Sequence, residues 1–302
     1  MTGEIIVLIT RRVGYNRPNF EPNRPSCLFM DHLSEIINRF SLQAGVFYTG
    51  KLCGLSNFNE GAAVEGHIHL LRRGTLSIIG LDKSTIVLDK PSIIFLPRPI
   101  KHGLQAKDTD NAELICATVT YGSGSSNLLA DALPDLLILP LAESPFLQTN
   151  IDWIIAEAGQ EQQGRQAVMN RLMEIFIISM MRSLINKGEI AQGMLAGLMH
   201  PQLKNVLQQL HNHCAEQWSL EKMAEIALMS RSKFAEVFKS VIGQTPNDYL
   251  VSWRVGVAQS LLKQGKNVSI VANSVGYETA SALARVFRKH THMSPKAWLE
   301  QQ

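Results

Sequence analysis

Residues 44–121 contain short runs rich in Val, Ile, Leu, Thr and Tyr. Gly, Pro, Asp and Lys residues separate these runs. Such runs are typical of strands, and their spacing between turn residues favours a β-barrel or sandwich. The predicted strands are Gly45–Lys51, Leu70–Leu81, Ser84–Leu88, Ile93–Leu96 and Glu113–Tyr121.

The pattern becomes helical after residue 150. Ala167–Leu184 has apolar residues three and four positions apart, which predicts one long helix. The apolar positions in Ile151–Ile155 and Met169–Ile185 either pair helices between two subunits or seal the barrel against the rest of the chain. We therefore expect an α+β protein with a β-barrel in residues 1–150, a helical linker that is also a possible dimerisation segment in residues 151–200, and an all-α domain in residues 201–302.

An internal repeat occupies the last 85 residues. Met223–Ala227 aligns with Val271–Val275, and each copy reads as a helix, a short turn and a second helix whose apolar residues face back. This arrangement is the helix-turn-helix motif. After the turn, Phe234 aligns with Leu283, Phe238 with Phe287, Pro246 with Pro295 and Leu250 with Leu299.

Between the two copies, Asn247–Lys263 has helical apolar spacing and predicts one continuous linking helix. A recognition helix fits the major groove of B-DNA, so two copies on a rigid helix can enter successive groove faces about 34 Å apart without a dimer. The candidate readers lie outside the core of each second helix: Arg231, Ser232, Lys233, Ala235 and Glu236 in the first copy, and Thr279, Ala280, Ser281, Ala284 and Arg285 in the second.

Charge is distributed unevenly along the chain. The net charge is +3, but residues 201–302 contain 12 Lys and Arg against 7 Asp and Glu, a local net charge of +5. A positive surface is what a phosphate backbone requires, although many helical domains carry a similar excess. The charge supports DNA binding without establishing it.

Other classes of protein find little support. The four cysteines form no CxxC pair, which argues against a disulfide framework or a zinc ribbon and favours a reducing cytoplasm. No apolar run is long enough to span a membrane, and there is no P-loop, dinucleotide fingerprint or nucleophile–base pairing.

The last third of the chain resembles the AraC family of transcription regulators over residues 205–299. The resemblance implies base contacts from Ser232, Ala235 and Glu236 in the first reading helix, and from Ala280, Ser281, Ala284 and Arg285 in the second. It implies phosphate contacts from Lys239 and Arg288. Two positions depart from the family pattern, with His292 in place of a usual Gly and Leu299 in place of a usual Arg. The matching segments are Trp218–Ala224, Met229–Phe234, Gly243–Leu250, Trp253–Arg254, Val275–Glu278 and Ser294–Pro295.

The first half resembles the two cupin motifs and, more closely, the cupin-type sensor halves of some AraC regulators. His67 and His69 form an HxH pair on one strand face, and His102 follows Pro97 by five residues. Three imidazoles would suit a divalent transition metal such as zinc, iron, copper or nickel. The Glu that usually completes the cupin ligands is absent.

Each of these residues has a second interpretation. The alternative for the histidines is that they line a ligand pocket or hydrogen-bond internally. Cys116 is either a small buried hydrophobe or an extra soft ligand. Arg72 and Arg73 are surface charges or an anion site, and Arg254 on the linking helix is expected to pair with a carboxylate rather than with a base.

The sequence therefore predicts a cytoplasmic, sequence-specific transcription regulator that binds double-stranded DNA and is controlled by a small molecule or a metal. RNA polymerase and a second copy of the chain are further possible partners, and no membrane is involved. The alternative is a metal-dependent cupin enzyme fused to a DNA-binding domain.

Overall fold

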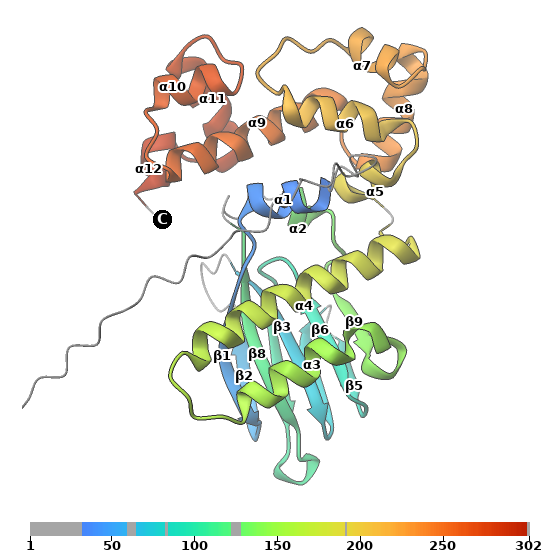
Figure 1. The fold of residues 1–302 in the computed structure, drawn as a ribbon, viewed down its shortest axis with the longest axis vertical. Coiled ribbons are helices and arrows are strands. Elements are labelled where there is room, and N and C mark those ends of the chain that lie inside the picture. Colours follow the sequence, from blue (N-terminus) through green and yellow to red (C-terminus); the bar gives the residue numbers. More distant parts are fainter. Residues whose placement is uncertain (1–31, 59–64, 82–83, 122–127, 191, 301–302) are drawn as a thin grey trace, which may run out of the picture. The chain divides into compact units, whose positions relative to one another are not determined.

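The computed structural model describes residues 32–58, 65–81, 84–121, 128–190 and 192–300. Strands lie in the first half of this range and helices make up the second (Figure 1). None of the helices in these segments combines the length and the apolar character that crossing a bilayer requires. The strands are β1 (Gln43–Lys51), β2 (Gly54–Phe58), β3 (Gly66–Arg73), β4 (Leu76–Leu81), β5 (Ser84–Leu88), β6 (Ser92–Leu96), β7 (His102–Ala106), β8 (Glu113–Thr120) and β9 (Leu137–Pro140).

The strands form two antiparallel sheets and not the closed barrel that the sequence predicts. The larger sheet has the order β1-β8-β3-β6-β9, and the smaller has the order β2-β7-β4-β5. β3 pairs with β6 and β8, whereas β4 pairs with β5 and β7, so these two neighbours in sequence belong to different sheets. The α+β class is confirmed, and the barrel is replaced by two sheets.

The prediction of a single strand over Leu70–Leu81 is wrong because the chain turns at Gly74. Its φ is +87°, and a Cβ there would lie 2.4 Å from the backbone oxygens of Asp110 and Asn111. Only glycine tolerates both conditions, so β3 ends at Arg73 and β4 begins at Leu76. The sequence analysis also missed β2, β7 and β9, three strands of only four or five residues.

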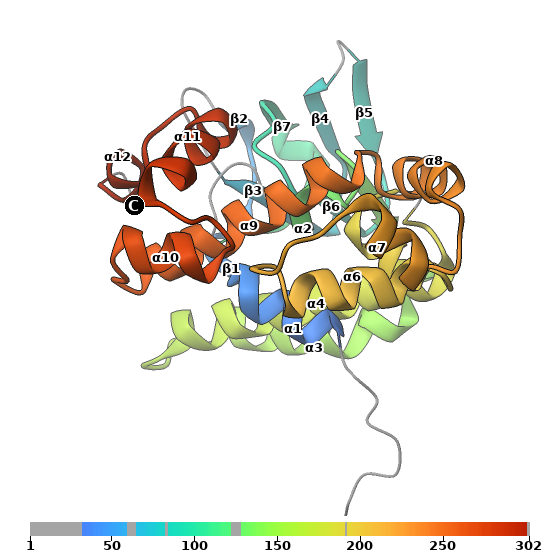
Figure 2. The same ribbon diagram turned by 90° about the horizontal axis from the view of Figure 1, so that it is seen from above.

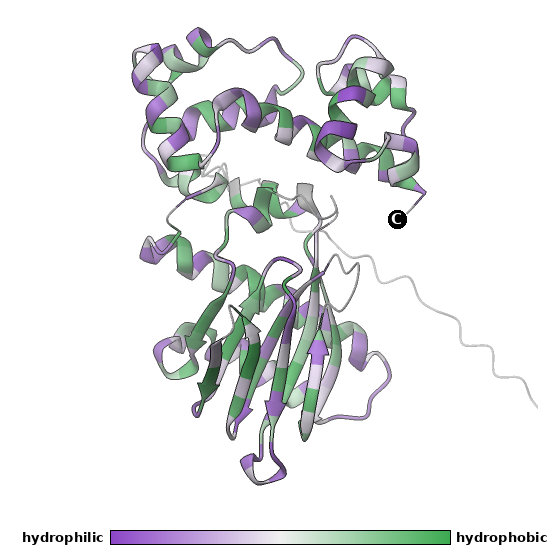
Figure 3. Cartoon of the chain, turned by 180° about the vertical axis from the view of Figure 1, so that it is seen from behind, coloured by the Kyte–Doolittle hydropathy of each residue, from purple (hydrophilic) through white to green (hydrophobic). Residues whose placement is uncertain are grey.

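Strand β3 is buried on both faces. Ile68 and Leu70 belong to a core that also contains apolar residues of the helices α3 (Pro145–Ala158) and α4 (Arg165–Lys187). Leu71, on the opposite face, belongs to a separate core between the two sheets. Hydrophobic residues accordingly run along the strands in Figure 3. His67 and His69 alternate with Ile68 and Leu70, so they point between the sheets.

Helix α4 is tied to strand β1 by polar side chains. The backbone N–H of Val46 donates to Oδ1 of Asn170 at 3.0 Å, and Nε2 of Gln166 donates to the Val46 carbonyl at 2.5 Å. Ile151 and Ile154 of α3 and Met169 of α4 are fully buried in the same core. These apolar positions are therefore used for packing inside the chain.

The repeat predicts the helical part well. Helices α7 (Leu220–Ile226) and α8 (Arg231–Ile242) form one helix-turn-helix unit, and α10 (Val268–Ser274) and α11 (Ala280–Thr291) form the second. Helix α9 (Pro246–Lys263) joins them, one residue longer than predicted because Thr245 caps it and Pro246 opens it. Figure 2 shows α9 running from the first unit to the second. The remaining helices are α1 (His32–Phe40), α2 (Leu128–Asp131), α5 (Met194–Met199), α6 (Leu203–Asn212) and α12 (Pro295–Leu299), with 3-10 turns at Asp108–Asp110 and Leu141–Glu143.

Equivalent positions of the two units have the same burial and the same backbone conformation. Phe234 and Leu283 are both fully buried, as are Phe238 and Phe287. The turn residue Leu228 has φ +55°, and its counterpart Gly276 has φ +85°. The two sequences therefore build one backbone shape twice.

Candidate nucleic-acid interface and histidine cluster

Helix α8 presents a polar face at its amino-terminal end. Ser230 caps the helix, since its Oγ accepts from the backbone N–H of Lys233. Phe234 and Phe238 hold the opposite face in the core, which turns the intervening positions outward. Of the candidates on this helix, Ala235 is half-buried, and the exposed ones are Arg231, Ser232, Lys233, Glu236 and Lys239.

Helix α11 repeats this arrangement. Thr279 is the cap, because its Oγ1 accepts from the backbone N–H of Ala282 at 3.1 Å. This bond assigns the Thr279 hydroxyl to capping, a role that the sequence analysis did not foresee. Leu283 and Phe287 are buried. Ala280 and Ala284 are half-buried, and the exposed candidates are Ser281, Arg285 and Arg288.

The two faces differ in how their cations are paired. On α8, Arg231 forms an ion pair with Glu221 of α7, and Nζ of Lys233 lies 3.3 Å from the Glu236 carboxylate. On α11, the side chains of Arg285 and Arg288 have no ion pair or hydrogen bond with any residue that the structure describes. The second helix therefore offers two guanidinium groups to an anionic partner, and the nearby Glu278 carboxylate does not pair with Arg285.

Arg254 serves the structure, as the sequence indicates, but its partners are different from those expected. It is 9% exposed, and its Nε donates to the Cys214 carbonyl at 2.7 Å. Its Nη2 donates to the backbone carbonyl of Glu216 at 2.8 Å. The predicted carboxylate partner is wrong, since two backbone oxygens of one loop take that place.

Three histidines come together between the two sheets. His67 and His69 lie on β3 and His102 begins β7, and they are 6%, 0% and 2% exposed. Their ring centroids lie 5.2 to 5.8 Å apart. Phe58 of β2 packs against all three rings at 4.9 to 5.3 Å, and the sequence analysis missed it because β2 has no clear strand pattern.

These imidazoles are uncharged at neutral pH. Burial lowers the pKa of His67 to about 4, with a smaller contribution from His102. Burial is also the main cause that lowers the pKa of His69 and of His102. Burial in a site of low dielectric constant disfavours the charged ring.

The hydrogen bonds assign the protons of the cluster. Nδ1 of His102 lies 2.7 Å from the Ile100 carbonyl, which can only accept, so this nitrogen carries the proton. Nε2 of a neutral His102 therefore accepts, and it lies 2.9 Å from Nε2 of His69, which donates. Nδ1 of His69 is left with a lone pair, and it is buried without a partner among the residues that the structure describes. An unsatisfied buried acceptor of this kind is costly and marks a position for a donor or an electrophile.

The cluster has one feature of a metal site and one that opposes it. A histidine whose Nδ1–H is held by a carbonyl is a common arrangement for a metal ligand, and His102 has it. However, His69 and His102 bond to each other, and the described residues contain no group of three His, Cys, Asp or Glu side chains arranged to hold an ion. In this arrangement, binding an ion would first require the His69–His102 hydrogen bond to open.

The neighbouring candidates have plain structural roles. Cys116 lies directly opposite His69 in the β3–β8 register, and burial raises the pKa of its thiol to about 12, so it is a buried neutral side chain. Arg72 and Arg73 both form ion pairs with Glu113, the first at 3.6 Å. Their interpretation as paired surface charges is supported. Cys53, Cys116 and Cys214 form no disulfide within the described residues, and Cys27 lies outside them.

Comparison with known proteins identifies both parts of the chain. The sequence model of a Cupin family matches residues 31–186, and that of a helix-turn-helix domain matches residues 223–301. The HTH-type transcriptional regulator AlkR of Acinetobacter baylyi is 34% identical over 306 residues, which cover 90% of this chain and 100% of AlkR. A putative AraC-like transcription regulator of Streptomyces lividans is 30% identical over 237 residues, 76% of this chain and 77% of that protein. The crystal structure of the DNA-binding domain of AdpA with a target DNA matches 33% of this chain and 91% of that one, at 33% identity and a TM-score of 0.32.

The alignments with AlkR and with the Streptomyces lividans protein extend over most of this chain and most of both relatives. The resemblance seen in the last third of the sequence is thereby confirmed along nearly the whole chain. This chain belongs to the AraC family of DNA-binding transcription regulators, with a cupin-type amino-terminal half.

Proposed function

We propose that this regulator reads a two-part DNA site, with α8 in one major-groove face and α11 in the next. The observation that carries the proposal is the pair of recognition helices, each buried on one side and polar on the other, on one 18-residue helix. An α-helix of this length extends about 27 Å, which is comparable to one turn of B-DNA. A single chain can then engage two successive half-sites.

Selection of bound duplexes from a random library tests this proposal. The full-length protein is expected to enrich a sequence with two conserved boxes about one helical turn apart. Recovery of a single box, or of no consensus, would refute two-part recognition. The proposed readers in this site are Arg231, Ser232, Lys233, Ala235, Glu236, Ala280, Ser281, Ala284 and Arg285, with Lys239 and Arg288 on phosphates.

We further propose that the cluster of His67, His69 and His102 is where the effector acts. Three buried imidazoles support this proposal, because Nδ1 of His69 is unpaired among the described residues. A hydrogen-bond donor on a small molecule would satisfy its lone pair. A divalent transition metal is the second type of effector that this chemistry allows, provided that the His69–His102 hydrogen bond opens.

Elemental analysis of protein purified without a chelator or a histidine tag separates the two types of effector. Stoichiometric zinc, iron, copper or nickel that is lost in His69→Ala supports a metal. Substoichiometric metal that is unchanged in His69→Ala supports a small molecule, which is then sought by thermal-shift screening against the same variant.

The DNA-bound form is proposed to act in the cytoplasm with RNA polymerase, and to pair with a second copy. Within the two segments that the sequence singles out for pairing, Trp153 is 54% exposed and Ile175 is 46% exposed, whereas Ile151 and Met169 are buried. Sedimentation of the wild type and of Trp153→Ser tests pairing. A dimer weakened by the substitution is expected, and an unchanged mass would contradict a contact through this surface.

A further inference from the structure

The two helix-turn-helix units meet at one loop. Residues 213–219, between α6 and α7, belong to the first unit, and Arg254 of α9 donates to two carbonyls of this loop, those of Cys214 and Glu216. Both bonds are short, at 2.7 and 2.8 Å, and the guanidinium is nearly buried. Charge-assisted hydrogen bonds in such a site are stronger than neutral ones, and removing the donor leaves two carbonyls without it.

The turn of the second unit rests on the same loop. The Tyr277 ring lies over Arg254, with 5.5 Å between the ring centroid and Cζ. A Cβ on Gly276 would come within 2.6 Å of the Ala215 carbonyl oxygen and 2.8 Å of Nη2 of Arg254. The backbone of the second unit therefore approaches the loop so closely that no larger residue fits. Arg254 therefore belongs to the linking helix and contacts both the first unit and the second unit.

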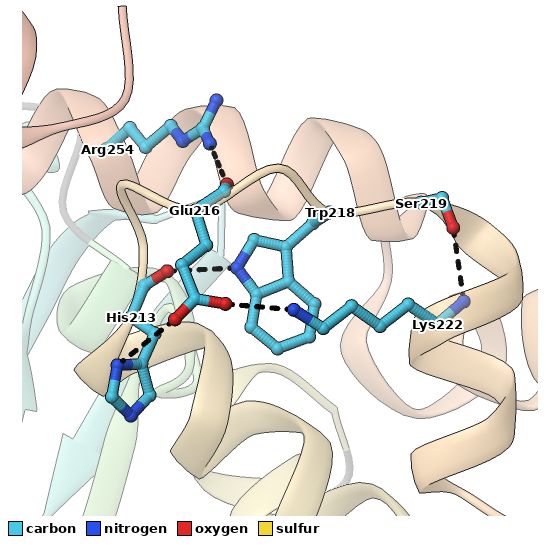
Figure 4. A network of polar contacts seen from close by, with 6 residues as sticks. All are labelled: His213, Glu216, Trp218, Ser219, Lys222 and Arg254. Atoms are coloured by element: carbon cyan, nitrogen blue, oxygen red, sulfur yellow. Dashed lines mark hydrogen bonds and ion pairs between the residues drawn. The ribbon is translucent and has the colours of Figure 1, made fainter.

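The loop itself is fixed to α7 by a network of polar contacts (Figure 4). The Glu216 carboxylate lies 2.9 Å from Nζ of Lys222 and 3.5 Å from Nδ1 of His213. The indole N–H of Trp218 donates to the His213 carbonyl at 3.0 Å, and Nζ of Lys222 lies 4.2 Å from the Trp218 ring centroid. Ser219 caps α7 by accepting from the Lys222 backbone N–H. A displacement of the loop would thus be transmitted to α7, which packs against α8.

We propose that Arg254 is a positioning residue that sets the spacing of the two DNA boxes. Without contacting DNA, it holds α8 and α11 at one mutual angle by joining the first unit's loop to the second unit's turn. One base pair changes the direction of a groove by about 35° and its position by about 3.4 Å. A rigid joint therefore accepts a single spacing, whereas a loosened joint accepts several. This inference rests on the proposed function, since it requires both helices to bind DNA.

The test uses full-length protein and duplexes built on the sequence that the wild type selects. The spacer between the boxes is changed by −1, 0, +1 and +2 base pairs, and a further duplex keeps only one box. The variants are Arg254→Met, which removes both hydrogen bonds, Arg254→Lys, which keeps the charge, and Tyr277→Leu, which removes the ring on the side of the second unit. Gln259→Met is the matched control, a buried polar residue of the same helix whose Oε1 has no partner in the part of the chain that the structure describes.

For the wild type and Gln259→Met, a change of one base pair is expected to lower affinity about tenfold or more, as a mismatch in the site does. For Arg254→Met, we expect affinities within about threefold across the four spacers, with single-box binding unchanged. Arg254→Lys and Tyr277→Leu should lie between these limits. If Arg254→Met does not fold, Arg254→Lys and Tyr277→Leu test the inference in its place. Their affinity should then depend less on spacer length than that of the wild type.

Two results would overturn the inference. The first is a spacing preference in the Arg254 and Tyr277 variants as strong as in the wild type. The second is an equal loss of single-box and two-box binding, which is what a purely structural role gives. Failure of the proposed function is distinguishable from both, because the wild type itself would then select no pair of boxes.

Discussion

Arg285 is the residue on which base recognition by the second unit should depend most. It is exposed on α11, unpaired within the described part of the chain, and its neighbours Ala280, Ser281 and Ala284 supply a single hydroxyl. An arginine can donate two hydrogen bonds to O6 and N7 of guanine, and losing that pair costs about 1–3 kcal/mol of discrimination. Arg285→Ala should therefore lose one guanine preference in a selection from a random library.

The matched control for this prediction is Arg288→Ala, on the same helix and also exposed. As a phosphate contact, Arg288 should affect all sequences alike and leave the consensus intact. A consensus from Arg285→Ala that keeps every guanine would mean that Arg285 does not read a base.

His292 stores backbone strain at the end of α11. It has φ +61°, and its counterpart at the end of α8 is Gly243 with φ +89°. The left-handed conformation costs a residue with a side chain roughly 1–2 kcal/mol, part of which the flexibility of unfolded glycine offsets. We expect His292→Gly to raise the free energy of unfolding by up to about 1 kcal/mol.

The measurement is chemical unfolding of both His292→Gly and Lys289→Gly. Lys289 is exposed and lies within α11, so glycine there should destabilise by about 1 kcal/mol. Destabilisation of similar size by both substitutions would show that the left-handed conformation of His292 is not strained.

The buried histidines make stability depend on pH. The pKa of His67 falls from 6.5 to about 4 on folding, so the unfolded chain binds more protons than the folded one between these values. The contribution of neutral His67 to the free energy of unfolding is fully present above pH 6.5 and is lost as the pH falls toward 4. Its full size is roughly 3 kcal/mol.

Chemical unfolding of the metal-free protein, in the presence of a chelator, tests this dependence. It is measured between pH 7.5 and 4.5, because the two pKa values of His67 place the change in this range. The carboxylates titrate alike in the wild type and in His67→Gln. Subtracting one free energy of unfolding from the other therefore cancels their contribution. That difference should change with pH below 6.5 and be constant above it. A difference that is flat throughout would contradict a neutral buried His67.

At the scale of elements, the two recognition helices should contribute unequally to salt dependence. Arg231 of α8 is held by Glu221 of α7, an ion pair that also lowers the pKa of the Glu221 carboxyl. Glu221→Gln frees this guanidinium, and it should steepen the dependence of log K on log salt by about one unit and strengthen binding to all sequences.

Glu225→Gln provides the control for Glu221→Gln. It removes the same charge from the same helix, but Glu225 makes no ion pair with the residues that the structure describes. Equal salt slopes for the two variants, measured on one duplex, would indicate that only net charge matters and that the ion pair of Arg231 has no effect.

Elements with local signals were predictable, and those that depend on distant pairing were not. The two units and α9 follow from apolar spacing within each helix and from the recurrence of the same pattern in the second copy. The break at Gly74 depends on the approach of the backbone at Asp110 and Asn111, so Leu70–Leu81 read as one strand. The two-sheet arrangement depends on β3 pairing with β8, more than 40 residues away, which no local pattern encodes.

The candidate sites divide in the same way. The three histidines were predicted to meet, because alternation places His67 and His69 on one face, and they do meet. The packing of Phe58 against them and the bond between His69 and His102 depend on how the second sheet lies, which was not predictable. The carbonyl partners of Arg254 belong to an irregular loop, and backbone acceptors leave no trace in a sequence.

At the scale of the whole molecule, the chain joins a nearly neutral first two thirds to a basic last third. The net charge of +5 in residues 201–302 lies on the part with the two helix-turn-helix units. This excess favours any polyanion, so specificity has to come from the exposed faces of α8 and α11. The account accordingly requires both a strong salt dependence and a sequence preference in the same protein.

The most direct test is the recovery of genomic DNA fragments bound by the purified full-length protein at increasing salt. We predict that nonspecific fragments are released first, and that a small set sharing two boxes one helical turn apart remains bound at the highest salt. Retention that is insensitive to salt, or a bound set without a common sequence, would contradict the assignment of this chain as a two-site reader of DNA.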